Sequence, residues 1–287
     1  MPTVTSIINL KGGVGKTTMT LALAHFLALE HAKRVLVIDL DPQTNATVCL
    51  IPETEWKERD EGGRTLYQLF AEQLKGAARF AAKDAIVKGV SNVGGGIPGL
   101  DLLPSSLRLL KIQERITQLT DFEQYERGPI FALRDALRDV LPSYDHVLID
   151  CPPSLGVVTL NGLAISHNYL IPVIPDTLSV LGIPPILDRV EHFAGCTRRT
   201  IRALGIVVSK MRLQTVLHSE MVRRLREDFY DRRFPLCFET VIPESTRIAE
   251  AADVMTRVNT LQQKYGNGGP YAELSALTRE YLAHVRR

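Results

Sequence analysis

The sequence predicts a doubly wound α/β fold, in which one mostly parallel sheet carries helices on both of its faces. Short apolar, β-branched runs alternate with longer helical patterns, as in parallel sheets with crossover helices. A strand over 4–10, a helix over 17–29 and a strand over 34–39 have the spacing of a right-handed strand–helix–strand unit. A glycine-rich loop joins the first strand to the first helix. We therefore expect one α/β domain over residues 1–287, with no second domain.

The later elements follow the same alternation. Further strands are expected at residues 100–103, 144–150, 169–173, 206–209 and 237–242. One or two helices are expected over residues 65–82, and further helices at about residues 106–119, 130–141, 155–165, 178–193, 215–229, 246–252 and 271–287. The region 52–99 is less regular, because 52–63 is charged and loop-like and 91–99 holds four glycines. We expect a variable, loop-rich insertion there.

The loop after the first strand predicts a phosphate-binding site. Residues 7–18 read I-I-N-L-K-G-G-V-G-K-T-T, and the glycines allow consecutive backbone N–H groups to turn toward an anion. The helix that follows directs its N-terminal dipole at the same place. Lys16 is expected to reach the β- and γ-phosphates, and the Thr17 hydroxyl to bind Mg²⁺. The predicted nucleotide-binding residues of this loop are Lys11, Gly12, Gly13, Val14, Gly15, Lys16, Thr17 and Thr18.

Acidic residues end two of the predicted strands. Asp39 and Asp41 follow the strand over 34–39, and Asp150 ends the strand over 144–150. The carboxyl ends of parallel strands meet at one edge of a sheet, which is where open α/β sheets bind ligands. Asp150 is expected to hold Mg²⁺ through water, opposite Thr17. An isolated acidic residue at a strand end is usually only a cap, so this prediction depends on the nearby phosphate loop.

Composition limits the class of protein further. Apolar residues make up 45% and charged residues 23% of the chain, as in soluble globular proteins, and no apolar run reaches membrane-spanning length. The four cysteines are scattered without a C-x-x-C pair, which argues against a zinc site, an iron–sulfur cluster or a disulfide framework. Because the first strand begins within four residues, we expect neither a signal peptide nor a preceding DNA-binding domain.

Charge is distributed unevenly along the chain. Residues 195–233 hold ten Lys or Arg and four Asp or Glu, a net charge of +6, whereas the whole chain carries +2. Such a basic segment is a candidate contact for nucleic acid. A solvated helix face is the usual meaning of such a run, and that alternative stays open. The predicted DNA-binding residues are Arg198, Arg199, Arg202, Arg223, Arg224 and Arg226.

Several motifs together resemble the ParA/MinD family of ATPases. The usual phosphate loop has glycine at position 10, but this chain has Leu10 followed by a second lysine, Lys11. The pattern x-K-G-G-x-x-K-[TS] resembles the deviant Walker A box of that family. The runs D-x-D-P-Q from Asp39, D-C-P-P-S from Asp150 and V-I-P-E-S-T-R from Val241 resemble later family segments. The resemblance covers nearly the whole chain and is closest to ParA (Soj)-type partitioning ATPases without an N-terminal DNA-binding domain.

The resemblance implies roles for individual residues. Lys11 reaches the phosphates bound by the partner subunit of an ATP-loaded homodimer, and it acts in catalysis together with Lys16 and Asp41. Asp41 orients the attacking water, and Asp39 lies nearer the magnesium shell, with Thr17 and Asp150. Met211 and Pro243 flank the adenine. Two positions depart from the family pattern, because Glu244 replaces an arginine and Ala252 a proline.

The resemblance also implies a function. The expected protein binds ATP and Mg²⁺, dimerises, binds double-stranded DNA non-specifically and is released when a ParB-like or cargo-adaptor partner stimulates hydrolysis. It would work in the cytoplasm on the nucleoid, positioning a plasmid, a chromosome origin or a protein cargo. A MinD-like membrane-cycling regulator is the main alternative, and it requires a basic amphipathic tail that the last helix does not provide. An interaction protein without hydrolysis and a metal-carrier ATPase are further alternatives. The first should lack a site residue, and the second should have cysteine ligands.

Overall fold

The computed structural model describes residues 1–77, 79–119, 129–212, 214–230 and 234–286. In this part of the chain seven strands form one parallel sheet in the order β3-β2-β4-β1-β5-β6-β7. The strands are β1 (Thr3–Ile7), β2 (Val35–Asp39), β3 (Leu100–Leu103), β4 (His146–Asp150), β5 (Asn168–Val173), β6 (Arg202–Met211) and β7 (Cys237–Pro243). The predicted doubly wound fold is therefore confirmed.

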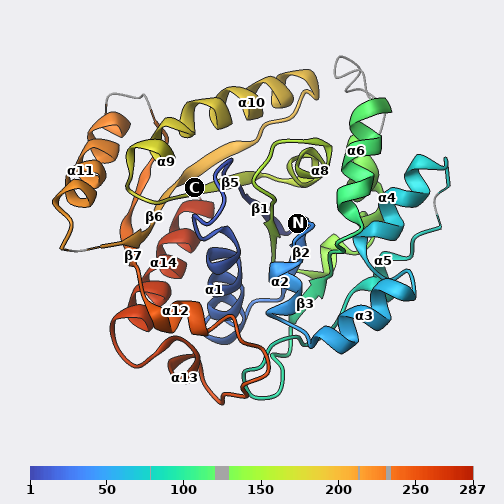
Figure 1. Ribbon diagram of the computed structural model, residues 1–287, viewed down its shortest axis with the longest axis horizontal. Coiled ribbons are helices and arrows are strands. Elements are labelled where there is room, and N and C mark those ends of the chain that lie inside the picture. Colours follow the sequence, from blue (N-terminus) through green and yellow to red (C-terminus); the bar gives the residue numbers. More distant parts are fainter. Residues whose placement is uncertain (78, 120–128, 213, 231–233, 287) are drawn as a thin grey trace.

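Helices cover both faces of this sheet (Figure 1). The α-helices are α1 (Lys16–Leu29), α2 (Asn45–Val48), α3 (Glu53–Glu61), α4 (Leu66–Leu74), α5 (Ala82–Ala85), α6 (Leu109–Leu119), α7 (Ala132–Leu137), α8 (Val157–Ile165), α9 (Thr177–Leu181), α10 (Ile183–Cys196), α11 (Val216–Tyr230), α12 (Thr246–Glu250), α13 (Leu261–Tyr265) and α14 (Gly269–Val285). Short 3-10 turns, Pro129–Phe131 and Leu141–Ser143, flank α7.

Two apolar clusters form the core, one on each face of the sheet. On one face α1 packs beside α14, and Phe26 and Tyr281 are fully buried there (Figure 1). On the other face side chains of α4, α7, α8 and α10 pack against the sheet, with Phe70 and Phe193 fully buried. The strands themselves are apolar in nearly every position, because a parallel sheet covered on both faces has no solvated side.

The central strands end at one level, and this aligns the acidic residues of the sequence. Asp39 on β2 pairs in register with Asp150 on β4, which in turn pairs with Ile7 at the end of β1. The loop that begins at Ile8 therefore starts directly beside Asp150.

Among the described residues, no helix is both long and apolar enough to cross a membrane.

Two sequence predictions about helices were wrong. The stretch 52–63 is not a loop, because residues Glu53–Glu61 form α3. Its exposed face carries an i,i+4 ion pair between Lys57 and Glu53, and its buried face is anchored by Trp56, whose Nε1 donates to the Ser105 carbonyl over 3.0 Å. The helix expected over 178–193 is divided into α9 and α10 at Gly182, because two prolines at the start of α10 cannot donate backbone hydrogen bonds to α9.

The close packing of β6 against β7 leads to a stability prediction. A Cβ atom at Gly205 would lie 2.6 Å from Cε1 of Phe238 and 2.7 Å from the Leu236 carbonyl oxygen. Gly205→Ala should therefore lower the free energy of unfolding by about 1–3 kcal/mol, measured by urea denaturation. Gly195→Ala is the matched control, because its Cβ meets no atom within 4 Å and alanine favours the helix. Equal stability of the two variants would contradict this packing.

Candidate nucleotide-binding site

The loop after β1 is held in shape by its own polar groups. The Asn9 side chain donates to the Pro172 carbonyl over 2.7 Å and accepts from the Lys11 backbone N–H over 2.8 Å. Gly13 and Gly15 have φ angles of +74° and +87°, which side-chain-bearing residues rarely adopt. Ser209 Oγ on β6 donates to the Val14 carbonyl over 2.7 Å. The loop thus has the open, glycine-dependent backbone that a phosphate group needs.

Lys16 begins α1 and folds back into this loop. Its side chain is buried, and its Nζ donates to the carbonyls of Asn9 and Lys11 over 3.2 and 3.1 Å. Burial lowers the pKa of Lys16, while the nearby carboxylates of Asp150 and Asp41 oppose that shift. A cation held mainly by neutral carbonyls at a loop of open N–H groups is placed to bind an anion.

Thr17 and Asp150 meet across the start of α1. Thr17 Oγ1 donates to Asp150 Oδ2 over 2.6 Å, and Thr20 Oγ1 lies 3.4 Å from Asp150 Oδ1. Asp150 is fully buried, and this burial raises its pKa to about 7, with the Asp41 charge acting in the same direction. A hydroxyl and a buried carboxylate side by side are the oxygen ligands that Mg²⁺ accepts beside nucleotide phosphates.

Asp39 and Asp41 have different surroundings. Asp39 is fully buried, and its carboxylate accepts from the Thr47 N–H and hydroxyl and from the Asp41 N–H. Burial and the neighbouring Asp150 raise the pKa of Asp39 well above its usual value. Asp41 Oδ1 accepts from the Gln43 N–H over 2.9 Å, and its carbonyl accepts from Ser105 Oγ over 2.7 Å. The Asp39 carboxylate thus orders the turn that carries Asp41. That Asp39 lies near a bound magnesium ion stays a prediction.

A cavity of about 190 Å³ lies at this site, and Lys16, Thr17 and Asp41 line it whereas Asp39 and Asp150 do not. It brings together predicted residues from the phosphate loop and Asp41 on β2's loop. Sequence reasoning missed four further lining residues, namely Gln43, Asn45, Pro153 and Lys210. Gln43 and Pro153 lie inside the D-x-D-P-Q and D-C-P-P-S runs, and Asn45 lies two residues after the first of them. These motifs could therefore have indicated all three residues. Lys210 also lines the cavity, and its backbone is left-handed, with a φ angle of 50°. Such a conformation is uncommon for lysine and cannot be predicted from the local sequence.

Lys11 lies apart from the cavity. Its Nζ contacts both carboxylate oxygens of Asp176 at 3.1 and 2.9 Å and Ser179 Oγ at 3.0 Å. Asp176 is also the N-cap of α9, where it accepts from the Ser179 N–H. The Lys11 ammonium thus contacts residues of its own chain, and Lys11 is not among the residues that line the cavity.

The residues predicted to flank adenine lie next to one another. Met211 and Pro243 pair in register at the ends of β6 and β7, and Met211 is buried. The Met211 carbonyl accepts from the Glu244 N–H over 2.9 Å. Glu244 stands where the family pattern has an arginine, and its carboxylate pairs with Arg212 at 2.5 Å. Contact with adenine itself remains a prediction.

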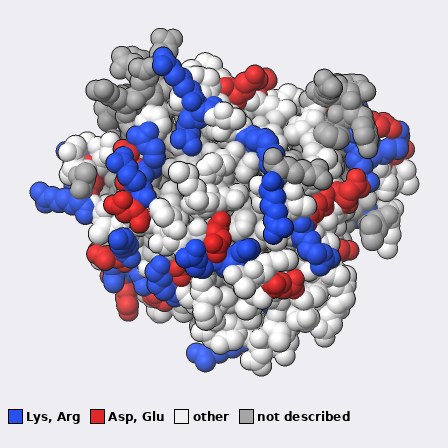
Figure 2. All heavy atoms as spheres, turned by 180° about the vertical axis from the view of Figure 1, so that it is seen from behind, with Lys and Arg blue, Asp and Glu red and all other residues white. Residues whose placement is uncertain are grey.

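The predicted DNA-binding arginines are largely engaged with neighbouring groups. Arg223 pairs with Glu227 at 2.5 Å, Arg224 lies 4.0 Å from Asp228, and Arg226 pairs with Glu239 on β7 at 3.1 Å. Arg202 donates to Asn168 and to the His284 carbonyl. Arg198 and Arg199 lie in the turn after α10. On the face shown in Figure 2, basic and acidic side chains are interspersed rather than separated.

The residues present fit a nucleotide with Mg²⁺. The loop offers backbone N–H groups and Lys16 for phosphates, while Thr17 and Asp150 offer adjacent oxygen ligands at its edge. Burial, together with neighbouring carboxylates, raises the pKa of Asp39 and of Asp150, which is the electrostatic situation that a bound cation relieves. Fold and loop together define a P-loop nucleotide-binding protein.

Comparisons with known proteins agree with this class. A family model described as an AAA domain matches residues 2–203. The chain is 34% identical over 247 residues to the chromosome-partitioning ATPase Soj of Thermus thermophilus, covering 86% of this chain and 83% of that protein. It is 30% identical over 286 residues to the chromosome partitioning protein ParA of Caulobacter vibrioides, covering 99% and 95% respectively.

A solved structure shares the fold. The cobyrinic acid a,c-diamide synthase from Mycobacterium smegmatis, with ADP and magnesium bound, matches with a TM-score of 0.73 at 24% identity over 100% of this chain and 96% of that chain. The family model and the sequence matches show that the chain belongs to the ParA/MinD family of P-loop ATPases. The family resemblance drawn from the motifs is confirmed.

The first test of the site is Lys16→Ala. Removing the ammonium takes away charge-assisted hydrogen bonds to phosphate, each worth about 1.5–3 kcal/mol, so the affinity for Mg·ADP should fall at least about 100-fold. Fluorescent-nucleotide titration measures the loss. Lys111→Ala, an exposed lysine on α6, is the control and should bind as the wild type does. Unchanged affinity of Lys16→Ala would contradict the assigned site.

Proposed function

We propose that this protein is a partitioning ATPase that binds Mg·ATP, dimerises, binds DNA non-specifically and is released by partner-stimulated hydrolysis. The arrangement of Lys16, Thr17 and Asp41 around one cavity, with Asp150 accepting from the Thr17 hydroxyl, carries this proposal. The names of its relatives, a chromosome-partitioning ATPase and a chromosome partitioning protein, support the biological role. The ParB-like or cargo-adaptor partner and the cytoplasmic, nucleoid-associated location belong to the same proposal.

The proposed chemistry is in-line attack of water on the γ-phosphate of ATP. Lys16 holds the β- and γ-phosphates and offsets the charge that develops on them. Asp41 orients the water, because its Oδ2 accepts no hydrogen bond from the described residues while Oδ1 is fixed by the Gln43 N–H. When bound, Mg²⁺ held at Thr17 and Asp150 supplies further neutralisation of phosphate charge.

The proposed dimer closes through Lys11. In the single chain its ammonium is satisfied by Asp176 and Ser179, at a half-buried ion pair that we propose is exchanged for phosphate when the dimer closes. Leu178 and Leu181 on α9 lie beside this pair and are 73% and 65% exposed. Large apolar side chains next to a releasable lysine are what an interface between two copies requires. Lys11 then joins Lys16 in stabilising the phosphates.

The proposed DNA contact uses the basic segment 195–233. Arg223 and Arg224 remain about two-thirds exposed although both lie near acids on their own helix. Exposed pairs are weak, so phosphate can displace the carboxylates. A dimer would present this surface twice and neutralise several phosphates at once. No groove-reading element is evident in the sequence, so the proposed binding is independent of base sequence. Plasmid, chromosome origin and protein cargo all remain compatible with this cycle.

The dimer model predicts a separation between binding and association. Lys11→Ala should bind Mg·ATP with nearly unchanged affinity, because Lys11 does not contact its own phosphate cavity. It should fail to dimerise, since the partner's phosphates lose a charge. Light scattering with ATP measures the dimer, with Lys111→Ala as the matched control. Equal ATP-dependent dimerisation of wild type and Lys11→Ala would contradict a dimer that closes through Lys11.

The role of Asp41 predicts a block in hydrolysis alone. Asp41→Ala should bind ATP and dimerise but lose water positioning, which commonly contributes about 10²–10⁴ in rate. Phosphate release with DNA and partner present measures the effect, and the variant should stay on DNA. A wild-type rate of hydrolysis would show that Asp41 does not have this role.

The basic segment predicts a charge-reversal phenotype. Arg223→Glu with Arg226→Glu should remove ATP-dependent DNA binding and leave dimerisation intact. Wild-type affinity should fall with salt by a log–log slope of roughly −0.9 per phosphate contact. Arg134→Glu on α7 with Arg138→Glu at its C-cap is the control, since both of these arginines also pair with an acid, Asp135. Undiminished binding of the first double variant to random duplex would move the contact to the turn after α10.

A further inference from the structure

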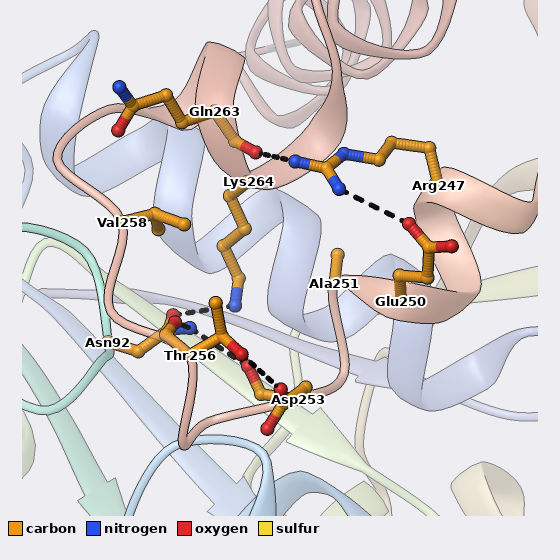
Figure 3. A pocket seen from close by; sticks show the side chains of 9 residues that line it. All are labelled: Asn92, Arg247, Glu250, Ala251, Asp253, Thr256, Val258, Gln263 and Lys264. Atoms are coloured by element: carbon orange, nitrogen blue, oxygen red, sulfur yellow. Dashed lines mark hydrogen bonds and ion pairs between the residues drawn. The ribbon is translucent and has the colours of Figure 1, made fainter.

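A second cavity lies between α12, α13 and the loop that carries Asn92 (Figure 3). Its volume is about 270 Å³, and none of its lining residues belongs to the nucleotide cavity. Figure 3 shows Lys264, Asn92 and Thr256 converging on one side of it, with Arg247 and Glu250 on the other. The proposed ATPase function uses none of these side chains.

The wall of this cavity is built by fixed contacts. The segment between α12 and α13 is joined to the Asn92 loop by a bridge between Val93 and Val258 and by the Gly94 N–H, which donates to the Val258 carbonyl over 2.8 Å. The Asn92 side-chain amide donates to the carbonyls of Asp253 and Thr256 over 2.9 and 2.6 Å. Its carbonyl oxygen is thereby directed toward Lys264.

Both acidic side chains of the cavity are already engaged. Glu250 pairs with Arg247 at 3.2 Å, and Arg247 also donates to the Gln263 carbonyl. Asp253 accepts from the Met255 N–H over 2.8 Å and from Thr256 Oγ1 over 2.6 Å, so its carboxylate caps its own turn. Neither carboxylate forms an ion pair with Lys264 among the described residues.

Lys264 is the unusual group. Its residue is only 4% exposed, and Nζ donates to a single acceptor among the described residues, Asn92 Oδ1, over 2.7 Å. An ammonium has three N–H donors, and burying one without a carboxylate partner is costly. Burial accordingly lowers the pKa of Lys264 to about 8.

The groups packed around Lys264 do not supply the missing negative charge. Burial lowers the pKa of His25 on α1 to about 3, so this imidazole is neutral at pH 7. Burial raises the pKa of the Cys49 thiol to about 11, so it too is uncharged. Tyr265 is buried and hydrogen-bonds to His25 over 2.8 Å. The Asp253 carboxylate, held in its capped turn, acts on Lys264 from a distance and opposes the lowering of the Lys264 pKa.

We propose that this cavity is a binding site for a small anionic molecule, whose carboxylate or phosphate group pairs with the Lys264 ammonium. The cavity lies just below the usual size of small-molecule sites, about 300–1,000 Å³, which suits a compact metabolite. Asn92 holds the amine in place as a neutral second partner. Arg247 stands on the opposite wall, where it meets the more distal part of the same molecule.

The direct test follows the Lys264 amine by NMR in lysine-labelled protein. Saturating Mg·ADP occupies the phosphate loop, so that added phosphate reports on the second cavity. Without anion the ε-carbon should titrate near pH 8. Inorganic phosphate or succinate should move that midpoint above 9, and affinity should weaken about tenfold per pH unit above the free midpoint as the ammonium loses its proton. A midpoint that neither anion moves overturns the proposal.

Variants provide the second readout, the midpoint of thermal unfolding with Mg·ADP present. Phosphate or succinate should raise it in a saturable way in wild type, in Lys264→Arg and in the exposed-lysine control Lys111→Met, and not in Lys264→Met. A rise with phosphate alone assigns a phosphate-bearing ligand, and a rise with succinate alone assigns a carboxylate. If Lys264→Met does not fold, the NMR midpoint of the wild type still decides. An equal rise in folded Lys264→Met contradicts the site.

Discussion

The site depends on one electrostatic constraint, the burial of neighbouring carboxylates at the carboxyl edge of a parallel sheet. Asp39 and Asp150 are adjacent in register and fully buried, and Asp41 follows within the same turn. Such a group is stable only when hydrogen-bond donors and cations surround it. Lys16 and Thr17 at the start of α1 and Thr47 on α2 supply these partners. The arrangement favours a bound cation, which ties the geometry to magnesium nucleotides.

Much of this could be predicted from sequence because the signals are local. A glycine loop between a strand and a helix, and acids at strand ends, fix both the fold class and the edge where the phosphate site lies. The features that sequence reasoning missed depend on tertiary contacts and on backbone conformation. Trp56 converts a charged stretch into α3 by donating to Ser105, a contact 49 residues away in the chain. Lys210 reaches the nucleotide cavity through a left-handed backbone that no motif announces.

A charge pattern counts residues and does not show their partners. The basic segment has a large excess of arginine, yet the Arg226 guanidinium is paired with Glu239 on another strand. Lys11 and Lys264 also show that the partners of a charged residue cannot be inferred from its sequence position. One lysine of the phosphate loop is satisfied by an acid of its own chain, whereas a lysine outside every recognised motif is buried with one neutral acceptor.

The most direct test of the account is a crystal structure of the protein with Mg²⁺ and a non-hydrolysable ATP analogue. The account predicts the γ-phosphate within hydrogen-bond distance of Lys16 Nζ and magnesium on Thr17 Oγ1. It also predicts that Lys11 leaves Asp176 and contacts the phosphates of a second copy. A closed dimer in which Lys11 stays on Asp176, or phosphates bound away from Lys16, would contradict it.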